Sequence, residues 1–188
     1  MAKLIPKVYG EALFEMAAEE GKELALMEEA ETLLEILKEN PELSKVMLHP
    51  GIPREEKLQL TEKIFRGRIS EELTGFLEAI VEKERYGEVS AILAFFIDEV
   101  KEEQGIGVAY VASALPLTDG QKEEVKKHLL ETTGYRKMEM HYQTDPALIG
   151  GMVIRIRDRV MDSSIRTRLD NLTKQLLKIQ KGASKSWI

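Results

Sequence analysis

The residue types that usually carry enzyme chemistry are few in this chain, and they are scattered. The chain has no cysteine, which removes disulfides, thiolate zinc sites and cysteine nucleophiles. Its three histidines, His49, His128 and His141, lie too far apart in the sequence to predict a metal site. Carboxylates are abundant, but runs such as Glu28-Glu29 and Glu71-Glu72 follow a helical pattern that is typical of a solvated face. We therefore predict no metal and no cofactor.

Motifs that bind nucleotides or build a hydrolase site are also missing. No Gly-rich loop runs into Lys and Ser or Thr, so we expect no direct nucleotide binding. Gly105-Ile106-Gly107 precedes an extended segment, which is the wrong context for a dinucleotide site. No Gly-x-Ser-x-Gly elbow and no His-Glu-x-x-His pair occurs. The sequence predicts a protein that is not an enzyme.

The spacing of apolar residues differs between the two parts of the chain, which indicates two kinds of structural element. Residues 1–104 repeat apolar side chains every three or four positions, and we predict six helices there. Asn40-Pro41 is a start signal for the third helix, and Val89 to Val100 place one apolar stripe on the sixth. Gly105-Ile106-Gly107 ends the helical pattern. This predicts an N-terminal six-helix bundle over residues 1–104.

Residues 105–188 alternate between extended and helical patterns, which predicts a small α+β domain with a short sheet and a long C-terminal helix. The predicted elements are strands near 108–112, 138–142 and 152–156, a return arm at Val160-Met161, a helix from the capping box at Thr118 to about Leu130, and a last helix after Asp162. The polar tail from Lys181 to Ile188 is expected to be disordered. The fold class is therefore mostly α.

Charge separates the two parts as well. Residues 1–104 hold 13 basic and 24 acidic side chains, a net charge of −11, whereas residues 105–188 hold 14 and 9, a net charge of +5. Opposite signs indicate two surfaces for two different partners. No segment approaches the roughly 20 apolar residues that cross a bilayer, and the N-terminus resembles no targeting peptide. We expect a cytoplasmic protein that reaches a membrane only through partners.

The first helix has a wider apolar face than a simple surface helix requires. The first and fifth helices could form a groove for an amphipathic partner helix. The candidate groove residues are Tyr9, Ala12, Leu13, Met16, Leu73, Phe76, Leu77 and Ile80. Burial of this face inside the bundle is the alternative, and periodicity alone slightly favours it.

The last helix has a heptad-like apolar seam with basic residues beside it. The seam consists of Ile165, Leu169, Leu172, Leu176 and Ile179, and the flanks carry Arg166, Arg168, Lys174 and Lys178. Such a seam is needed if the helix covers the sheet. The alternative is that its basic flanks meet an acidic coiled coil.

Three stretches of sequence resemble the ATP synthase delta subunit family, which includes the mitochondrial oligomycin-sensitivity-conferring protein. The densest match runs from Leu148-Ile149-Gly150-Gly151 through Val153–Ile156 to Asp162–Leu169 and Leu172. Tyr9–Phe14 is similar to the family's first helix, and Lys83–Tyr86 to the segment before its sixth helix. Arg157-Asp158 departs from the Gly-Asp that the family usually has, which predicts a strained or altered hairpin turn.

The resemblance implies a non-catalytic stator subunit of a rotary, proton- or sodium-translocating ATP synthase. It implies that the N-terminal bundle grips the N-terminal segments of alpha subunits and that the C-terminal domain joins the b-subunit peripheral stalk, at the cytoplasmic face of the cell membrane. The family signature maps onto Gly150, Gly151, Asp162, Ser164, Arg168 and Leu169. We expect Asp162 or Ser164 to cap the last helix.

Two other functions remain as hypotheses. A nucleic-acid or ribosome-associated adaptor could use the basic residues Arg155, Arg157, Arg159, Arg166 and Arg168 to contact phosphates. No run of stacking aromatic residues accompanies them, which counts against nucleic acid as a partner. An unrelated helical scaffold is the other alternative.

Overall fold

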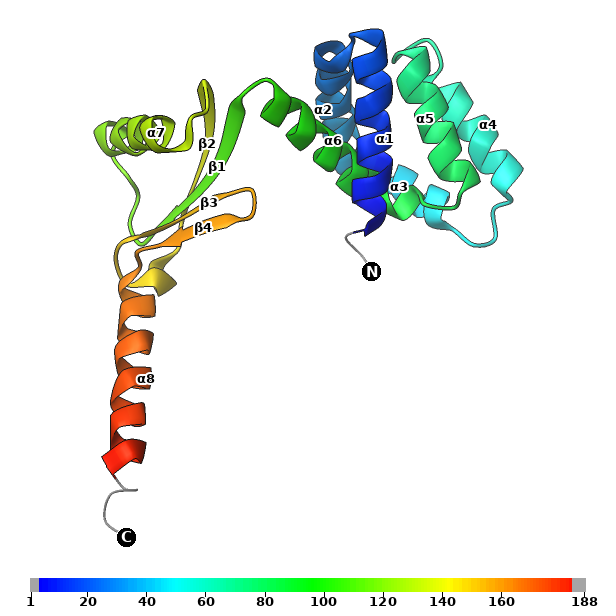
Figure 1. Cartoon of the computed structure of the whole chain (residues 1–188). Helices are drawn as coiled ribbons and strands as arrows, with labels where there is room; N and C mark the ends of the chain where they lie inside the picture. The colour runs from blue at the N-terminus through cyan, green and yellow to red at the C-terminus, as the bar shows by residue number, and fades with distance from the viewer. Residues whose placement is uncertain (1–3, 184–188) are drawn as a thin grey trace. The chain divides into compact units, whose positions relative to one another are not determined.

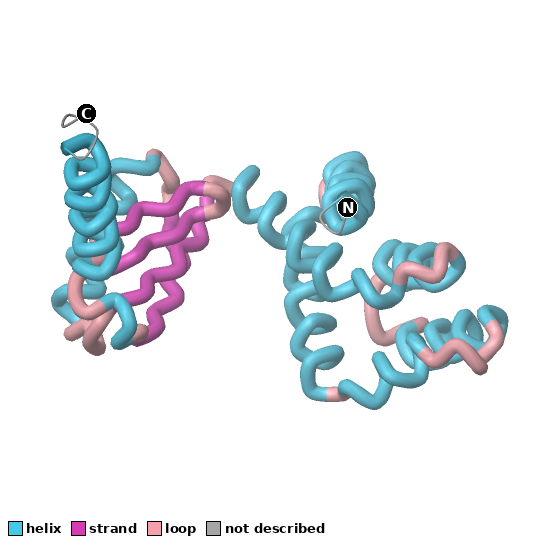
Figure 2. The backbone as a smooth tube through the Cα atoms, turned by 90° about the horizontal axis from the view of Figure 1, so that it is seen from below, coloured by secondary structure: helices cyan, strands magenta, loops and turns pink. Residues whose placement is uncertain are grey.

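The computed structural model describes residues 4–183, and their side chains as far as Gln175. The chain divides into two compact units, Met1–Gln104 and Gly105–Ile188. Figures 1 and 2 show a helical unit and a unit built on one sheet. The predicted class, mostly α with a short sheet and a long C-terminal helix, is confirmed for the described residues.

The helical unit follows the start and stop signals of its sequence. Its elements are α1 (Leu4–Glu20), α2 (Glu23–Glu39), α3 (Pro41–Leu48), α4 (Arg54–Phe65), α5 (Glu71–Glu82), the short 3-10 helix η1 (Tyr86–Glu88) and α6 (Val89–Glu103). Pro41 occupies the first position of α3, where its missing N–H costs nothing. Ser70 caps α5, because its Oγ accepts a hydrogen bond from the Leu73 N–H at 3.3 Å.

Helix α6 lies at the centre of this unit and packs against α1 and α2 (Figure 1). Its apolar stripe is buried, with Ile92, Leu93 and Phe96 at 0% exposure. Helix α1 approaches it closely at Gly10, where an added Cβ would lie 2.5 Å from Cδ1 of Phe95. The glycine therefore sets the distance between the two helices.

The second unit is a four-stranded sheet with two helices. Its elements are β1 (Ile106–Ser113), α7 (Asp119–Thr133), β2 (Lys137–Thr144), the 3-10 helix η2 (Pro146–Leu148), β3 (Met152–Ile156), β4 (Arg159–Asp162) and α8 (Ile165–Ala183). The strand order is β2-β1-β3-β4, with β1 and β2 parallel and the other pairs antiparallel. Helix α7 is the crossover between the parallel strands, and the predicted capping box is present at its start.

One face of the sheet forms a small core under α7. Ala109, Leu129, Met138 and Ile156 are buried together there. The Tyr142 hydroxyl donates a hydrogen bond to the Lys122 carbonyl of α7 at 3.0 Å, which fixes the helix over this face.

Helix α8 does not cover the sheet, contrary to one of the two sequence hypotheses, and it extends beyond the end of the strands (Figure 1). Ile165, Leu169 and Leu172 keep 42%, 48% and 55% of their surface exposed. The side chains of Leu176 and Ile179 lie outside the described residues. The apolar seam is therefore open where it is described.

Two element boundaries differ from the sequence prediction, and one turn agrees with it. Helix α8 continues to Ala183. The prediction of a disordered tail is therefore wrong for residues 181–183, which are helical because no proline interrupts the helix there. Residues 184–188 of that predicted tail lie outside the described range. Ile106 and Gly107 already belong to β1, which leaves Gly105, at φ +67°, as the joint. Arg157, in the turn between β3 and β4, adopts φ +48°. This agrees with the prediction of a strained hairpin turn, since a positive φ is uncommon for residues other than glycine.

Candidate docking surfaces

The predicted groove residues separate into a buried group and an open group. Leu13, Leu73 and Ile80 have no exposed surface, and Leu77 is 2% exposed. All four belong to the core that α1 and α5 share with the rest of the helical unit. The alternative of burial within the unit is therefore correct for these four, because their stripes face the core.

The other four groove residues flank that buried stripe. Tyr9, Met16 and Phe76 are partly buried and pack on the edge of the core, and Ala12 is exposed. Side chains in this position support the core with one side and offer the other to solvent. These four residues, Tyr9, Ala12, Met16 and Phe76, hereafter the α1/α5 strip, are the predicted groove residues that keep solvent-exposed surface.

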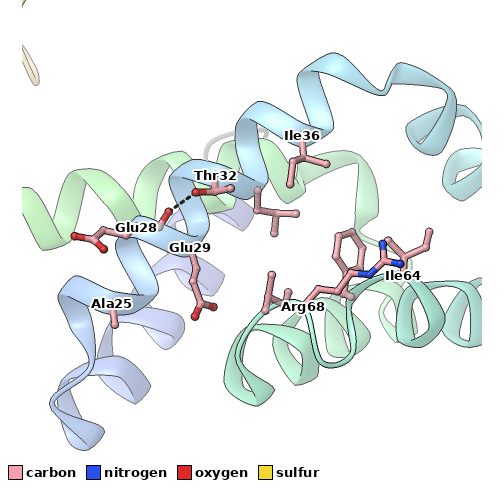
Figure 3. A pocket seen from close by; sticks show the side chains of 10 residues that line it. Ala25, Glu28, Glu29, Thr32, Ile36, Ile64 and Arg68 are labelled. Atoms are coloured by element: carbon pink, nitrogen blue, oxygen red, sulfur yellow. Dashed lines mark hydrogen bonds between the residues drawn. The ribbon is translucent and has the colours of Figure 1, made fainter.

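A separate hollow of about 470 Å³ lies between α2 and the end of α4, and the sequence did not predict it (Figure 3). Its lining combines apolar and charged side chains: Ala25, Glu28, Glu29, Thr32, Leu33, Ile36, Ile64, Phe65, Arg68 and Ile69. Ile36 is 41% exposed beside the buried stripe of α2. The sequence did contain one sign of this hollow: Ile36 is an apolar residue of α2 that lies outside the buried stripe of that helix.

Hydrogen bonds and ion pairs hold the rim of this unit. The Glu29 carboxylate accepts a hydrogen bond from the Ser70 N–H at 2.9 Å, which ties α2 to the start of α5. Lys22 pairs with both Glu20 and Glu72, and these contacts raise the pKa of Lys22 above its ordinary value. The hydrogen bond from Lys22 lowers the pKa of Glu72 to about 2. The Lys22 contacts link the turn between α1 and α2 to the start of α5.

The two signature glycines are required by close packing at the base of α8. An added Cβ on Gly150 would lie 2.5 Å from Cδ1 of Ile165. Gly151 has φ +74°, and its Cβ would lie 2.5 Å from the Ser163 carbonyl oxygen. The Gly150 carbonyl in turn accepts the Ile165 N–H at 2.9 Å. The glycines thus join the start of β3 to the first turn of α8.

Both predicted capping residues act at the start of α8. The Oγ of Ser164, a residue that is 1% exposed, accepts the Thr167 N–H at 3.2 Å. The Asp162 carboxylate accepts the Ser164 N–H at 2.8 Å and the Thr167 hydroxyl at 2.7 Å. These hydrogen bonds to Ser164 and Thr167 lower the pKa of Asp162 below its ordinary value.

The last two signature residues lie on the exposed surface of α8. Arg168 is exposed, and Leu169 forms the open stripe with Ile165 and Leu172. An apolar stripe flanked by Arg166, Arg168 and Lys174 is typical of a helix that packs against an acidic helix. The signature residues therefore fall into two groups. Gly150, Gly151, Asp162 and Ser164 fix the start of α8, and Arg168 and Leu169 lie on its exposed surface.

Within residues 4–175 no three His, Asp or Glu side chains lie close enough to hold a metal ion. None of the helices described has the length and apolar composition that crossing a membrane requires.

Two units of opposite net charge, each with apolar surface left open, are typical of a protein that contacts other proteins. A family model described as the ATP synthase delta (OSCP) subunit matches residues 5–176. The chain belongs to this family, as a structural and non-catalytic subunit of ATP synthase. The nucleic-acid adaptor hypothesis has no support from the comparisons.

Similar proteins agree with that assignment along nearly the whole chain. The ATP synthase subunit delta of Lachnoclostridium phytofermentans is 47% identical over 182 residues, covering 97% of this chain and 100% of that protein. The corresponding protein of Brevibacillus brevis is 31% identical over 175 residues, covering 93% of this chain and 99% of its own. A chain in the Toxoplasma gondii mitochondrial ATP synthase structure has the same fold, with a TM-score of 0.79 at 19% identity over 93% of this chain and 98% of that one.

Proposed function

We propose that this chain is the joint between the catalytic head and the peripheral stalk of a rotary ATP synthase, with one unit for each side. The helical unit binds the N-terminal segments of alpha subunits, and the second unit binds the end of the b-subunit stalk. The observation that carries the proposal is the pairing of opposite net charges with two separate open apolar surfaces. Such surfaces select different partners.

The α1/α5 strip suits a helical segment of an alpha subunit. Tyr9, Met16 and Phe76 offer aromatic and thioether surface on a rigid support, since each also packs on the core. Large side chains that are held in place lose little entropy on binding. The partner's apolar residues would supply the missing half of this contact.

The basic helix α8 suits the stalk. Its stripe of Ile165, Leu169 and Leu172 is open, and its basic flanks favour an acidic helical partner. Held at both ends, the chain would resist the torque that the rotating shaft exerts on the head. It would lie on the cytoplasmic face of the cell membrane and contact that membrane only through its partners.

Calorimetry on the whole chain tests this division. An alpha-subunit N-terminal peptide and a soluble C-terminal fragment of the b subunit are each titrated alone and then in the presence of the other. We expect each to bind and neither to displace the other. Competition for one site, or failure of both to bind, would contradict the proposal.

A further inference from the structure

A second hollow of the helical unit, of about 340 Å³, lies where the end of α3, the start of α4 and the end of α5 meet. Most of its lining is apolar and consists of Met47, Leu48, Pro50, Ile52 and Val81. Glu84 and Tyr86 also line it, and both belong to the segment that is similar to the sequence before the family's sixth helix. A hollow of this size, mostly apolar with a few polar groups, is typical of a small-molecule site. It is hereafter the Tyr86 hollow.

The Tyr86 hydroxyl is a buried donor that needs an acceptor. Tyr86 is 8% exposed, and its hydroxyl has no hydrogen-bond partner among the described residues. Burial raises the pKa of Tyr86 above its ordinary value, an effect that the nearby Ser44 hydroxyl opposes without reaching hydrogen-bond geometry. The phenol therefore keeps its proton at neutral pH. A buried polar group without a partner costs stability, and a ligand that accepts its hydrogen bond recovers that cost.

Two cationic side chains line the same hollow. Arg54 and Lys57 lie three positions apart at the start of α4, so they project from the same side of the helix. Lys57 is only partly exposed, which strengthens the attraction of its charge for an anion. Arg54 approaches Glu55 at 3.9 Å, a distance too long for a hydrogen bond.

The sign of the local charge is opposite to that of the unit around it. With Arg54, Lys57 and Glu84, the described lining of the Tyr86 hollow has a net charge of +1, whereas residues 1–104 carry −11. An anion is therefore attracted to this place and repelled by most of the remaining surface of the unit.

The hollow beside Ile36 offers a contrast within the same unit. Its charged lining residues are Glu28, Glu29 and Arg68, a net charge of −1. The Glu29 carboxylate already accepts the Ser70 N–H. Apolar space is common to both hollows, but the buried free hydroxyl and the positive charge are features of the Tyr86 hollow.

We propose that the Tyr86 hollow binds a small amphipathic anion, whose carboxylate or phosphate group meets Tyr86, Arg54 and Lys57. Its apolar body lies against the apolar lining. The site does not use the α1/α5 strip or α8, so the inference is independent of the proposed function. Because the lining comes from α3, α4, α5 and the turn before α6, the bound anion stabilises the contact between these elements.

Four probes titrated into the whole chain by calorimetry test the ligand class: octanoate, octyl phosphate, octanol and inorganic phosphate. We expect at least one of the two amphipathic anions to bind and to raise the melting temperature, and the tighter of the two identifies the preferred head group. Octanol lacks the charge and inorganic phosphate lacks the apolar body, so each should bind at least tenfold more weakly. Octanol binding as tightly as both anions, or no binding of either anion, would overturn the inference.

Three variants locate the site. Tyr86→Phe removes only the hydroxyl and should weaken binding of the preferred anion about tenfold, as expected for a hydrogen bond to a charged group. Lys57→Gln should weaken it about threefold. Lys63→Gln, a matched control at an exposed position of α4 outside the lining, should stay within about twofold of wild type.

The stability of the free chain gives a second readout for Tyr86→Phe. Since the hydroxyl has no partner in the free chain, urea unfolding should show Tyr86→Phe to be as stable as wild type or more stable. A clear loss of stability would show that the protein itself satisfies the hydroxyl, and would contradict the proposal. Wild-type affinity in both folded Tyr86→Phe and folded Lys57→Gln would also exclude this hollow as the site.

Discussion

The two units use their apolar residues in different ways. The helical unit buries most of them in one continuous core that includes residues from α1 to α6. Among the described residues of the second unit, the core cluster is small: it consists of Ala109, Leu129, Met138 and Ile156, with Val111 also buried. Large apolar side chains stay exposed on the sheet, in the connections and on α8: Tyr110, Leu115, Ile149, Val160, Met161, Ile165, Leu169 and Leu172. Apolar surface that is exposed and contiguous usually marks an interaction site.

This difference indicates how each unit contributes to a mechanical joint. The helical unit is stabilised by its own packing and offers a narrow strip at the edge of that packing. The second unit leaves apolar surface open on the described part of α8 and on the sheet face that carries Tyr110 and Val160. Stability and binding should therefore respond differently to substitutions in the two units.

The largest effect is expected from the core of the helical unit. Phe96→Ala should lower the free energy of unfolding by about 3–5 kcal/mol, because the ring is fully buried and its loss leaves a cavity. Leu172→Ala on α8 should change it by less than about 0.5 kcal/mol, since 55% of that side chain is exposed. Urea unfolding followed by circular dichroism measures both. Equal losses of unfolding free energy for Phe96→Ala and Leu172→Ala would contradict the proposed difference in packing between the two units.

The next effect concerns binding at the α1/α5 strip. Phe76→Ala should weaken binding of an alpha-subunit N-terminal peptide by about 1–3 kcal/mol if the ring is a central anchor. Phe14→Ala is the matched control, because Phe14 also packs on the edge of the core but lies on another side of α1. Calorimetry gives the affinities, and thermal melting confirms that both variants fold. Equal affinity for wild type and folded Phe76→Ala would remove the strip as a site.

A smaller effect is expected at the start of α8, where Ser164 caps the helix. Ser164→Ala should destabilise the second unit by about 1 kcal/mol, because the Thr167 N–H loses its acceptor. Hydrogen exchange of the first turn of α8 reports this locally. Protection that matches wild type would show that the cap does not stabilise the helix.

Asp162 should make the stability of the start of α8 depend on pH. Its pKa is lower in the folded chain than the ordinary value of 3.8, so its stabilising effect is complete above that value and is lost as the pH falls through the folded pKa. Asp162→Asn should remove this dependence and bring the stability at neutral pH closer to that in acid. The measurement is unfolding of both chains from pH 7 to pH 2. Parallel curves would contradict the assignment.

The smallest effect belongs to the surface charge cluster of Lys22, Glu20 and the partly buried Glu72. Since the pKa of Glu72 is about 2 rather than 4.5, its contribution is present above pH 4.5 and fades as the pH falls towards 2. Exposure of Lys22 allows water and salt to screen the pair. Glu72→Gln should therefore matter at low ionic strength and become indistinguishable from wild type in 1 M salt. An effect that persists there would indicate a role beyond charge.

Much of the architecture could be predicted because local signals agree with the fold. Pro41, Ser70 and the Thr118–Gln121 capping box begin helices where the structure begins them, and alternation at 152–156 places β3 correctly. The cap at Asp162 and Ser164 was also predictable, because short polar side chains before an apolar helical pattern bond to free N–H groups. Such signals depend only on neighbours in the sequence.

The binding surfaces were less predictable. Periodicity shows that Leu13 and Phe76 are on apolar faces, but only the packed structure shows that Leu13 is core and Phe76 is at its edge. A helical pattern gives the direction of a stripe and not how many neighbours cover it. The hollow beside Ile36 was missed for the same reason.

Local sequence patterns were enough to predict the helices, the strands, the change of character at Gly105, the charge of each half and the family. The sequence did not predict that β1 pairs with both β2 and β3, which brings His141, Tyr110 and Arg155 into one row. It also did not predict that α8 extends beyond the sheet instead of covering it. The two kinds of feature differ in the sequence distance between the residues that make the contacts. Helix caps and periodicity depend on residues within a few positions, whereas strand register and coverage depend on contacts between residues tens of positions apart.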